Sequence, residues 1–458
     1  MAIQNTNIQD IVYKRLIADE IVRYLATKDI IVLHGARQVG KTYILYYLQN
    51  LLKEKRLATH FIDLEDSRYV RILDAGVEEF IRYLSEEGFD GPKYTGAKER
   101  LFVFIDEIQY LENPSPFMKI IADHYPWLKL IVSGSSSFEI KKKFTDSLSG
   151  RTVDFEVYNL SFTEFLLFKK YRFSPAPAYG LGYRKPNHRP LAYGLGYRKP
   201  NHRPLAYGLG YRKPNHRPLA YTEKKLQELK ALYEEYVLFG GYPKIVLAGD
   251  VKIKEKYLQQ IIDTYIKKDI RDLAGIKDVN KFNRLVEALA SQSGQLLNVF
   301  ELSNTCNIAK PTVENYLFLL EQTYVVKSVR PFSRNLRSEL SKTPKIFFYD
   351  TGLMQMLWLK ELPKEVMGQV FETSIFAELV KKYGSQRVAY WRTTDKKEID
   401  FVLKKGKSYL PLEVKLNFAQ FKASPIKYFK EKYHISEHRV VGLHGKVKDK
   451  QCIYPWQL

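Results

Sequence analysis

The sequence predicts an α/β protein whose N-terminal half is a parallel sheet covered by helices. Three observations support this fold class. Short apolar segments alternate with segments of helical periodicity between residues 14 and 158. One apolar segment runs into a glycine-rich loop and then a helix, and another ends in two adjacent acids. Because parallel strands need crossover connections, this alternation indicates a parallel sheet with helices on both faces.

The individual elements follow from periodicity and from turn residues. Buried strands read as continuous apolar runs, and helices place apolar residues three or four positions apart. The expected strands are 29–33, 58–64, 101–108, 128–132 and 152–158, and the expected helices are 14–26, 43–52 and 77–84.

The loop at residues 34–42 matches the phosphate-binding pattern G-x-x-x-x-G-K-[ST]. Its two glycines let the backbone turn tightly and point N–H groups at phosphate, while the lysine reaches the β- and γ-phosphates. The threonine hydroxyl ligates Mg²⁺, and the positive end of the following helix faces the phosphates. The loop residues are Gly35, Ala36, Arg37, Gln38, Val39, Gly40, Lys41 and Thr42.

Asp106 and Glu107 end the strand expected at 101–108. Such a strand is the usual partner of a phosphate loop. Asp106 is expected in the Mg²⁺ shell, mostly through water, and Glu107 is expected to orient and deprotonate the attacking water. The alternative is that both acids are ordinary surface charges at a strand end.

Two further residues are candidates for the same site. Ser133 follows the strand at 128–132, where a hydroxyl can hydrogen-bond the γ-phosphate or the attacking water; the alternative is a serine-rich turn. Arg151 precedes the last strand, where it could contact the γ-phosphate in cis or reach a neighbouring subunit's nucleotide as an arginine finger. A surface arginine is equally compatible with the spacing.

Composition bounds the class of protein. The net charge is +22, which favours a polyanionic partner, most often nucleic acid, although a lysine-rich solvated surface is the alternative. The two cysteines, Cys306 and Cys452, provide neither a disulfide framework nor metal-ligand spacing. No apolar run approaches the roughly 20 residues that span a bilayer, and the first ten residues are polar. We therefore expect a cytoplasmic protein without a membrane partner.

A 14-residue unit occurs three times without variation, at 178–191, 192–205 and 206–219. The copies contribute +9 of the net charge and leave +13 for the rest of the chain. Two prolines and two glycines per unit cannot sustain a helix, so the unit interrupts a helical lid. Identity of the copies suggests a recent tandem duplication. The alternative is a basic arm that touches nucleic acid through the Tyr183, Arg184, Lys185, His188 and Arg189 of each unit.

Residues 299–349 have the order of a winged helix. The expected helices are 299–306 and 311–321, with proline at the start of the second, and the expected wing strands are 324–330 and 344–349. A DNA-binding interpretation places Lys310, Thr312 and Asn315 in a groove. The wing loop, with Arg334, Arg337 and Lys342, would then lie on phosphates. The alternative is a winged helix used only for packing.

The last 90 residues hold a second candidate site. A helix at 368–379 carries Glu372, and strands are expected at 387–392, 398–403 and 409–415. Asp400, Glu413 and Lys415 fit the D…E-x-K pattern of metal-dependent nucleases, with Glu413 and Lys415 on one strand face. Asp400 and Glu413, together with Glu372, are the expected Mg²⁺ ligands, and Lys415 would steady the attacking water.

The order of these motifs resembles the predicted prokaryotic ATPases of the AAA+ superfamily that carry a C-terminal domain of unknown function. The resemblance rests on the phosphate loop, Asp106 and Glu107, and residues 133–135, 150–151, 240–243, 349–353, 398–400 and 413–415. It implies an ATP-binding core, a winged helix and a restriction-endonuclease-like C-terminal fold. The expected divisions are a core at 1–160, a lid at 161–250 interrupted by the repeats, a helical and winged-helix domain at 251–345, and the C-terminal domain at 346–458.

The leading functional hypothesis is therefore an ATP-binding and ATP-hydrolysing protein, with ATP and Mg²⁺ as cofactors, that acts on or near DNA. One alternative is a nucleotide-gated, Mg²⁺-dependent DNA nuclease. Another is a nucleotide-switched protein-interaction module without catalysis at its C-terminus. Protein partners and a homo-oligomer are compatible with each hypothesis.

Overall fold

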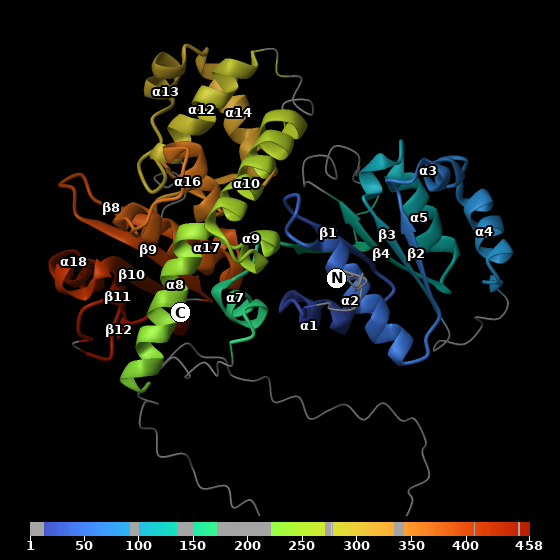
Figure 1. Cartoon of the computed structure of the whole chain (residues 1–458), viewed down its shortest axis with the longest axis horizontal. Helices are drawn as coiled ribbons and strands as arrows, with labels where there is room; N and C mark the ends of the chain where they lie inside the picture. Colours follow the sequence, from blue (N-terminus) through green and yellow to red (C-terminus); the bar gives the residue numbers. More distant parts are fainter. Residues whose placement is uncertain are drawn as a thin grey trace, which may run out of the picture.

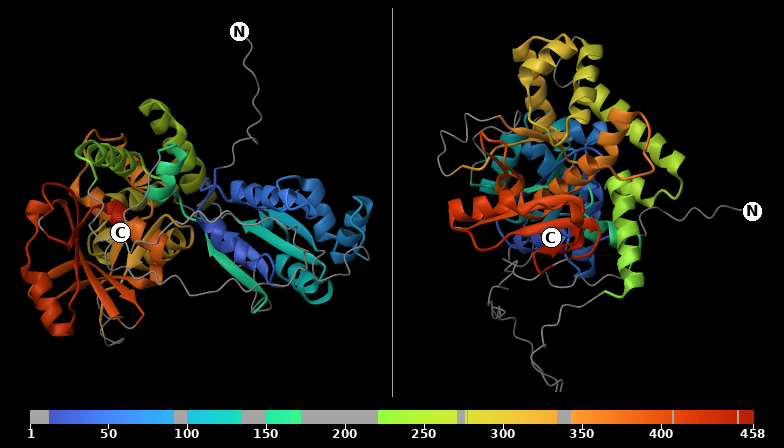
Figure 2. Two further views of the ribbon diagram at one scale, coloured as in Figure 1. Left: turned by 90° about the horizontal axis from the view of Figure 1, so that it is seen from below. Right: turned by 90° about the vertical axis from the view of Figure 1, so that its left-hand side faces the viewer.

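The computed structural model describes residues 13–91, 100–134, 148, 150–171, 221–270, 276, 278–333, 343–406, 408–447 and 449–458. The sheet that carries the phosphate loop lies at one end of the molecule, and a second sheet lies at the other end (Figures 1 and 2). In the view of Figure 1, α9 (Pro243–Leu247) lies between the two sheets, α12 (Val279–Ser291) to α14 (Lys310–Gln322) lie above them, and α8 (Glu223–Phe239) runs downward beside the C-terminal sheet. The three tandem repeats and the expected wing loop with its three basic residues lie outside the described residues.

The first sheet confirms the predicted fold class. Its five strands are all parallel, in the order β2-β3-β4-β1-β5. Alternate residues of β1 face two different cores, since Ile31 and Leu33 pack on the side of α2 whereas Ile30 and Val32 pack on the side of α4 and α5. The strands are β1 (Ile30–His34), β2 (Thr59–Asp63), β3 (Leu101–Asp106), β4 (Leu128–Gly134) and β5 (Thr152–Glu156).

Two of the three predicted helices of this core, 43–52 and 77–84, lie close to α2 and α4, whereas α3, η4 and α5 were not predicted. The helix expected at 14–26 is short, because α1 gives way to a 3₁₀ turn at Val22. The helices are α1 (Ile17–Ile21), η2 (Val22–Tyr24), α2 (Lys41–Glu54), α3 (Ser67–Asp74), α4 (Val77–Glu86), η4 (Ile108–Tyr110) and α5 (Pro114–His124).

The middle of the chain is helical and ends in a two-stranded ribbon. Helices α13 and α14 form a helix-turn-helix, and the antiparallel strands β6 and β7 follow it. The elements are α7 (Phe162–Phe168), α8 (Glu223–Phe239), α9 (Pro243–Leu247), α10 (Val251–Ile261), the π-helical η6 (Ile262–Ile270), α12 (Val279–Ser291), α13 (Val299–Cys306), α14 (Lys310–Gln322), β6 (Val326–Val329), β7 (Lys345–Phe348) and α16 (Thr351–Leu359).

The C-terminal sheet is mixed, in the order β12-β11-β10-β9-β8, and α17 packs on it. Strands β8 to β10 are antiparallel neighbours, whereas β11 runs parallel to β10. The elements are α17 (Gly368–Tyr383), η7 (Ser385–Arg387), β8 (Val388–Arg392), β9 (Glu398–Lys405), β10 (Ser408–Asn417), η8 (Phe418–Gln420), α18 (Ser424–Tyr433), β11 (Arg439–His444), β12 (Cys452–Ile453) and η9 (Pro455–Gln457).

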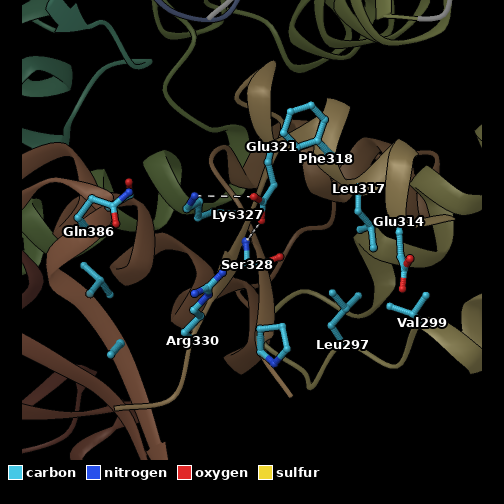
Figure 3. A pocket seen from close by; sticks show the side chains of 14 residues that line it. Leu297, Val299, Glu314, Leu317, Phe318, Glu321, Lys327, Ser328, Arg330 and Gln386 are labelled. Atoms are coloured by element: carbon cyan, nitrogen blue, oxygen red, sulfur yellow. Dashed lines mark hydrogen bonds and ion pairs between the residues drawn. The ribbon is translucent and has the colours of Figure 1, made fainter. Parts of the chain in front are cut away.

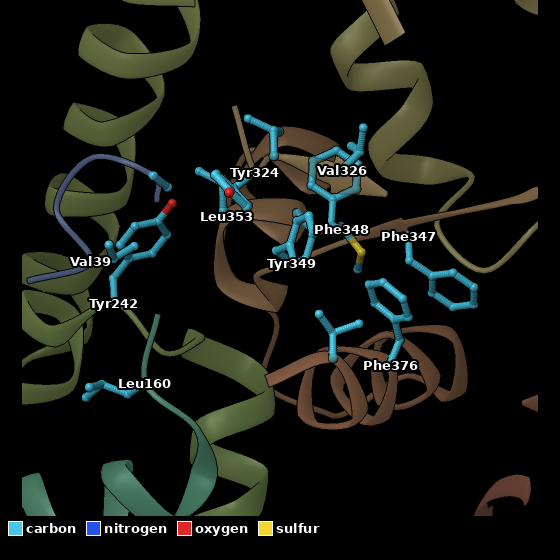
Figure 4. Packing of buried hydrophobic residues seen from close by; sticks show 14 of the residues in the cluster. Val39, Leu160, Tyr242, Tyr324, Val326, Phe347, Phe348, Tyr349, Leu353 and Phe376 are labelled. Carbon is cyan, nitrogen blue, oxygen red and sulfur yellow. The ribbon is translucent and has the colours of Figure 1, made fainter. Parts of the chain in front are cut away.

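Asp350 joins the segment after the first sheet to the later helices. It lies just before α16 and is 4% exposed. Its carboxylate accepts hydrogen bonds from the backbone N–H groups of Gly241 and Leu353, both at 2.8 Å, and from the Asn159 amide. A Cβ atom at Gly241 would lie 2.4 Å from the Leu160 carbonyl oxygen, so only glycine permits this approach. The buried aromatic residues around this junction continue from the phosphate loop to the ribbon (Figure 4).

Candidate functional site

The phosphate loop connects strand β1, which lies between β4 and β5 and is buried along its whole length, to α2. Gly40 caps α2 with a φ of 94°, a conformation that strains any residue with a side chain. Gly35 is required for a different reason, because a Cβ atom there would lie 2.0 Å from the Val157 carbonyl oxygen. The loop is therefore held against the end of β5, with its backbone at the carboxyl edge of the sheet.

Four predicted residues from three elements meet at this edge. The Lys41 side chain is buried, and its Nζ donates hydrogen bonds to the carbonyl oxygens of Gly35 at 3.2 Å and Ala36 at 3.0 Å. Asp106 accepts a hydrogen bond from the Ser133 hydroxyl and another from the Thr42 hydroxyl. Burial raises the pKa of Asp106, although these two hydrogen bonds act in the opposite direction.

Glu107 lies directly after Asp106 in the left-handed conformation, with a φ of 54°. Its backbone N–H donates to Asp106 Oδ1 at 3.1 Å, and its carboxylate accepts a hydrogen bond from the Gln109 amide. Glu107 therefore stands beside the predicted Mg²⁺ ligands, but in this conformation Gln109 holds its carboxylate. Gln109 was not predicted as a site residue.

Arg15 was also not predicted as a site residue, and its side chain holds the phosphate loop through a hydrogen bond. Its guanidinium donates to the Val39 carbonyl oxygen at 2.6 Å and to the Tyr158 carbonyl oxygen at 2.8 Å. It forms an ion pair with Glu164 at 2.8 Å, in which both side chains are 6% exposed. A basic residue 20 positions before the loop carries no periodic signal that would identify this role.

The structure contradicts one alternative for Arg151. Strand register pairs Ile30 with Thr152, so Arg151 precedes the amino end of β5, whereas the phosphate loop follows the carboxyl end of β1. The five residues of β1 separate these two edges by about 16 Å. The arginine is half-buried and pairs with Asp123 on α5, 2.7 Å away. The contact in cis is therefore wrong, and the contact with a neighbouring subunit's nucleotide stays a prediction.

His34, the last residue of β1, links the phosphate loop to the ribbon. Its Nδ1 lies 2.6 Å from the Tyr324 hydroxyl, which in turn donates to Glu156 Oε1 at 3.3 Å. Tyr324 precedes β6, and its ring packs edge-on against Tyr158 and Tyr349. The loop and the ribbon are thus joined by a buried hydrogen bond between residues 290 positions apart.

A second cluster, here called the acidic centre, comprises Lys345, Glu372, Glu398, Asp400, Glu413 and Lys415. Lys415 Nζ lies between two carboxylates, 2.9 Å from Asp400 Oδ2 and 2.8 Å from Glu413 Oε2. Asp400 also accepts the backbone N–H of Val414 at 2.7 Å. The antiparallel pairing of β9 and β10 therefore brings the three predicted residues Asp400, Glu413 and Lys415 together.

Glu372 joins the acidic centre from α17, and a lysine from another part of the chain accompanies it. Lys345, at the start of β7, lies 3.3 Å from Glu372 Oε1 and 2.6 Å from Glu398 Oε1. Burial lowers the pKa of Lys345, but the two carboxylates outweigh it and raise the pKa to about 12. Strand alternation could have identified Glu398 from the sequence, since it lies two residues before Asp400 on the same strand face. No such pattern identifies Lys345.

The predicted three-carboxylate Mg²⁺ site is not arranged as expected. Within the described ranges, no group of three or more histidine, cysteine, aspartate or glutamate side chains is arranged to hold a metal ion. Lysine ammonium groups bridge the carboxylates of Glu372, Asp400 and Glu413 instead. Burial, followed by the nearby Asp400, raises the pKa of both Glu372 and Glu413. These carboxylates are crowded, and lysines from the chain itself compensate part of their charge.

The charged side chains named on α14 are of mixed sign and do not form a basic cluster. Lys310 and Asn315 are exposed on α14 and Thr312 is half-buried, but Lys310 lies 3.8 Å from Glu314. A hollow of about 590 Å³ lies beside α14 and the ribbon, lined by both acidic and basic side chains (Figure 3). Phe318 lines the hollow, and it and Phe300 are 51% and 69% exposed. None of the described helices is long and apolar enough to cross a membrane.

Comparisons with known proteins divide the chain into three matched regions. Residues 27–166 match the family model described as an AAA domain. Residues 230–364 match a domain of unknown function (DUF8612), and residues 367–455 match another (DUF4143). The phosphate loop and Asp106 fall in the first region, Lys345 in the second, and the carboxylates of the acidic centre in the third.

Similar proteins cover most of the chain. An uncharacterized protein of Haemophilus influenzae is 24% identical over 403 residues, which span 86% of this chain and 84% of that protein. An uncharacterized protein of Methanocaldococcus jannaschii is 23% identical over 397 residues, or 85% of this chain and 75% of that one. Among solved structures, the Walker-type ATPase of Pyrococcus abyssi superposes with a TM-score of 0.44 at 15% identity, over 76% of this chain and 97% of that chain.

Proposed function

The chain combines an AAA domain with two C-terminal domains of unknown function, and from this premise we propose that it binds and hydrolyses ATP. The observation that carries the proposal is the meeting of Lys41, Thr42, Asp106 and Ser133 at one edge of the parallel sheet. Ligands usually bind in open α/β folds at this carboxyl edge. The hydroxyl and carboxylate oxygens of Thr42 and Asp106 are the hard donors that Mg²⁺ prefers.

Each residue has a distinct role in this proposal. Lys41 exchanges its two backbone carbonyl acceptors for phosphate oxygens, so its buried ammonium group keeps its hydrogen bonds when nucleotide binds. Thr42 and Asp106 would hold Mg²⁺, which neutralises charge on the phosphates. Ser133 orients the Asp106 carboxylate. Glu107 takes a proton from the attacking water once its carboxylate leaves Gln109.

Two substitutions separate nucleotide binding from hydrolysis. Lys41→Ala is expected to reduce ATP turnover at least about 100-fold, because it removes the charge that stabilises the transferred phosphoryl group. Glu107→Gln is expected to bind ATP normally and to hydrolyse it at a similarly low rate. ATP hydrolysis and binding of a fluorescent ATP analogue are measured in parallel. Normal turnover in both variants would refute this assignment of the site.

We further propose that ATP hydrolysis serves an action on or near DNA. The support is the excess of 13 positive charges outside the repeats and the helix-turn-helix of α13 and α14. ATP hydrolysis with and without single- and double-stranded DNA tests this proposal, together with DNA affinity at several salt concentrations. Phosphate contacts impose a steep salt dependence. DNA binding that is absent or insensitive to salt would favour a protein partner, which the exposed Phe300 and Phe318 would also suit.

A second candidate function is metal-dependent cleavage of DNA at the acidic centre. The observation that favours it is the placement of Lys415 between Asp400 and Glu413, because such a lysine can stabilise charge that develops on a phosphate. DNA nicking by the whole protein is measured with Mg²⁺ and with Mn²⁺, and Asp400→Ala should abolish it. If the wild-type protein nicks no DNA with either ion, this candidate fails, whereas the ATPase proposal stands.

A further inference from the structure

Lys345 crosses from one matched domain into the site of another. It is the first residue of β7, paired with Val329 of β6, and its side chain is only 5% exposed. Its ammonium group reaches Glu372 on α17 and Glu398 on β9, both of which belong to the C-terminal domain. The ribbon therefore inserts a positive charge into the acidic centre. A buried lysine that bridges two domains needs an explanation, since burial of charge is costly.

The acidic centre remains short of positive charge even with this lysine. Its four carboxylates face three cationic groups, namely the ammonium groups of Lys345 and Lys415 and the guanidinium of Arg392, which lies 3.3 Å from Glu398 Oε2. Glu413 is 4% exposed, and its Oε1 atom has no hydrogen-bond partner among the described residues. A buried carboxylate oxygen without a donor is costly, and a cation would satisfy it. This oxygen is evidence for a cation that is independent of the acidic residues being clustered.

We propose that Lys345 is a built-in cation that closes the acidic centre to divalent metal ions. While its ammonium group holds Glu372 and Glu398, a divalent ion would meet both its repulsion and the loss of two carboxylate ligands. When the ribbon withdraws Lys345, Glu372 and Glu413 become available to the ion, and Glu398 keeps only its ion pair with Arg392. The proposal rests on the second candidate function, because it assigns the regulation of that same site.

The ribbon of β6 and β7 also contacts the residue before the phosphate loop. Through this contact, a change at the loop would control the closure of the acidic centre by Lys345. At the end of the ribbon opposite Lys345, Tyr324 bonds to His34, the residue before the phosphate loop, and Tyr349 packs beside it (Figure 4). Strands of four residues separate the two ends. A shift of the phosphate loop would therefore reach Lys345 through a short, hydrogen-bonded element.

Binding of Mn²⁺ to the full-length, nucleotide-free protein tests the proposal, with free Mn²⁺ measured by electron paramagnetic resonance. Lys345→Met should bind Mn²⁺ at least tenfold more tightly than the wild-type protein. The gain should disappear in Lys345→Met/Glu413→Gln. Lys345→Arg keeps the charge and should bind as weakly as wild type. Lys397→Met is the matched control, because it removes a surface lysine that pairs with Asp395 beside the same strand.

Lys345→Met removes the lysine partner of Glu372 and one of the two cationic partners of Glu398, so folding is checked by circular dichroism. Lys345→Met/Glu398→Gln also removes the charge of Glu398, and it should also fold and bind Mn²⁺ more tightly than wild type. If Lys345 only locks the domains together, both variants lose stability without any gain in Mn²⁺ affinity, and the proposal is overturned. If no variant shows Mn²⁺ binding that depends on Glu413, the metal-dependent function fails as well. Binding by wild type that depends on Glu413, but is unchanged by Lys345→Met, overturns the closure alone.

Discussion

The phosphate loop and the acidic centre both bury lysine side chains, but they hold them in opposite ways. Lys41 donates to the backbone carbonyl oxygens of Gly35 and Ala36, within its own loop. Lys345 and Lys415 instead form ion pairs with carboxylates, which for Lys345 come from α17 and β9 and for Lys415 from its own strand and the neighbouring strand β9. A neutral carbonyl is readily exchanged for a phosphate oxygen, whereas separating a buried ion pair leaves a charge uncompensated. The first site is thus ready for a ligand, and the second is closed by its own residues.

The same contrast applies to the backbone. The phosphate loop depends on main-chain geometry, with Gly35 against the Val157 carbonyl group and Gly40 at a positive φ. The acidic centre depends on side chains projecting from regular elements, namely β7, α17, β9 and β10. Backbone substitutions should therefore disable the first site, and charge substitutions should reorganise the second.

The largest effect that separates the two sites is expected from Gly35→Ala. The added methyl group would lie 2.0 Å from the Val157 carbonyl oxygen, so the loop or the end of β5 must move. We expect a loss of about 3 kcal/mol in stability, the upper end of the usual cost of overpacking. ATP affinity should fall at least about tenfold because the N–H groups of the loop are displaced. Thermal unfolding and binding of a fluorescent ATP analogue measure these changes.

Gly249→Ala is the control for this substitution, since no atom lies within 4 Å of a Cβ atom there. It should leave both stability and ATP affinity close to those of the wild-type protein. If Gly35→Ala behaves like the control, the loop is not fixed by its contact with β5, and the contrast between a backbone-built site and a side-chain-built site breaks down.

The sequence predicted the phosphate loop region well because its signals are local. The loop, its strand and its helix occupy one continuous stretch, and Asp106 and Ser133 each follow an apolar run. Parallel strands then bring their carboxyl ends to one edge whatever the loops between them. The register of β1 and β5 places Arg151 at the opposite edge of the sheet, which excludes a contact with the γ-phosphate in cis. This register is set by tertiary pairing of the strands, so the spacing of residues in the sequence does not reveal it.

The acidic centre was predicted only in part, because its charge balance is assembled from remote segments. The D…E-x-K spacing identified Asp400, Glu413 and Lys415, and strand alternation would have added Glu398. Lys345 lies 27 positions before Glu372 on a strand that pairs with β6 in another region, so no local pattern connects the two. Elements after residue 420, including α18, β11 and β12, also went unpredicted, since short strands without turn motifs carry little signal.

A smaller effect is expected from Tyr324→Phe, which removes the hydroxyl that hydrogen-bonds to His34. This bond links the phosphate loop to the ribbon that carries Lys345. The ring remains to pack against Tyr158 and Tyr349. Loss of the hydrogen bond should cost about 1 kcal/mol. If the ribbon couples the sites, ATP affinity and Mn²⁺ affinity should each change by a few-fold, whereas Tyr409→Phe, in the C-terminal sheet, should change neither. A Tyr324→Phe protein with unaltered affinities would show instead that the two sites work independently, because a coupling free energy must appear at both of them.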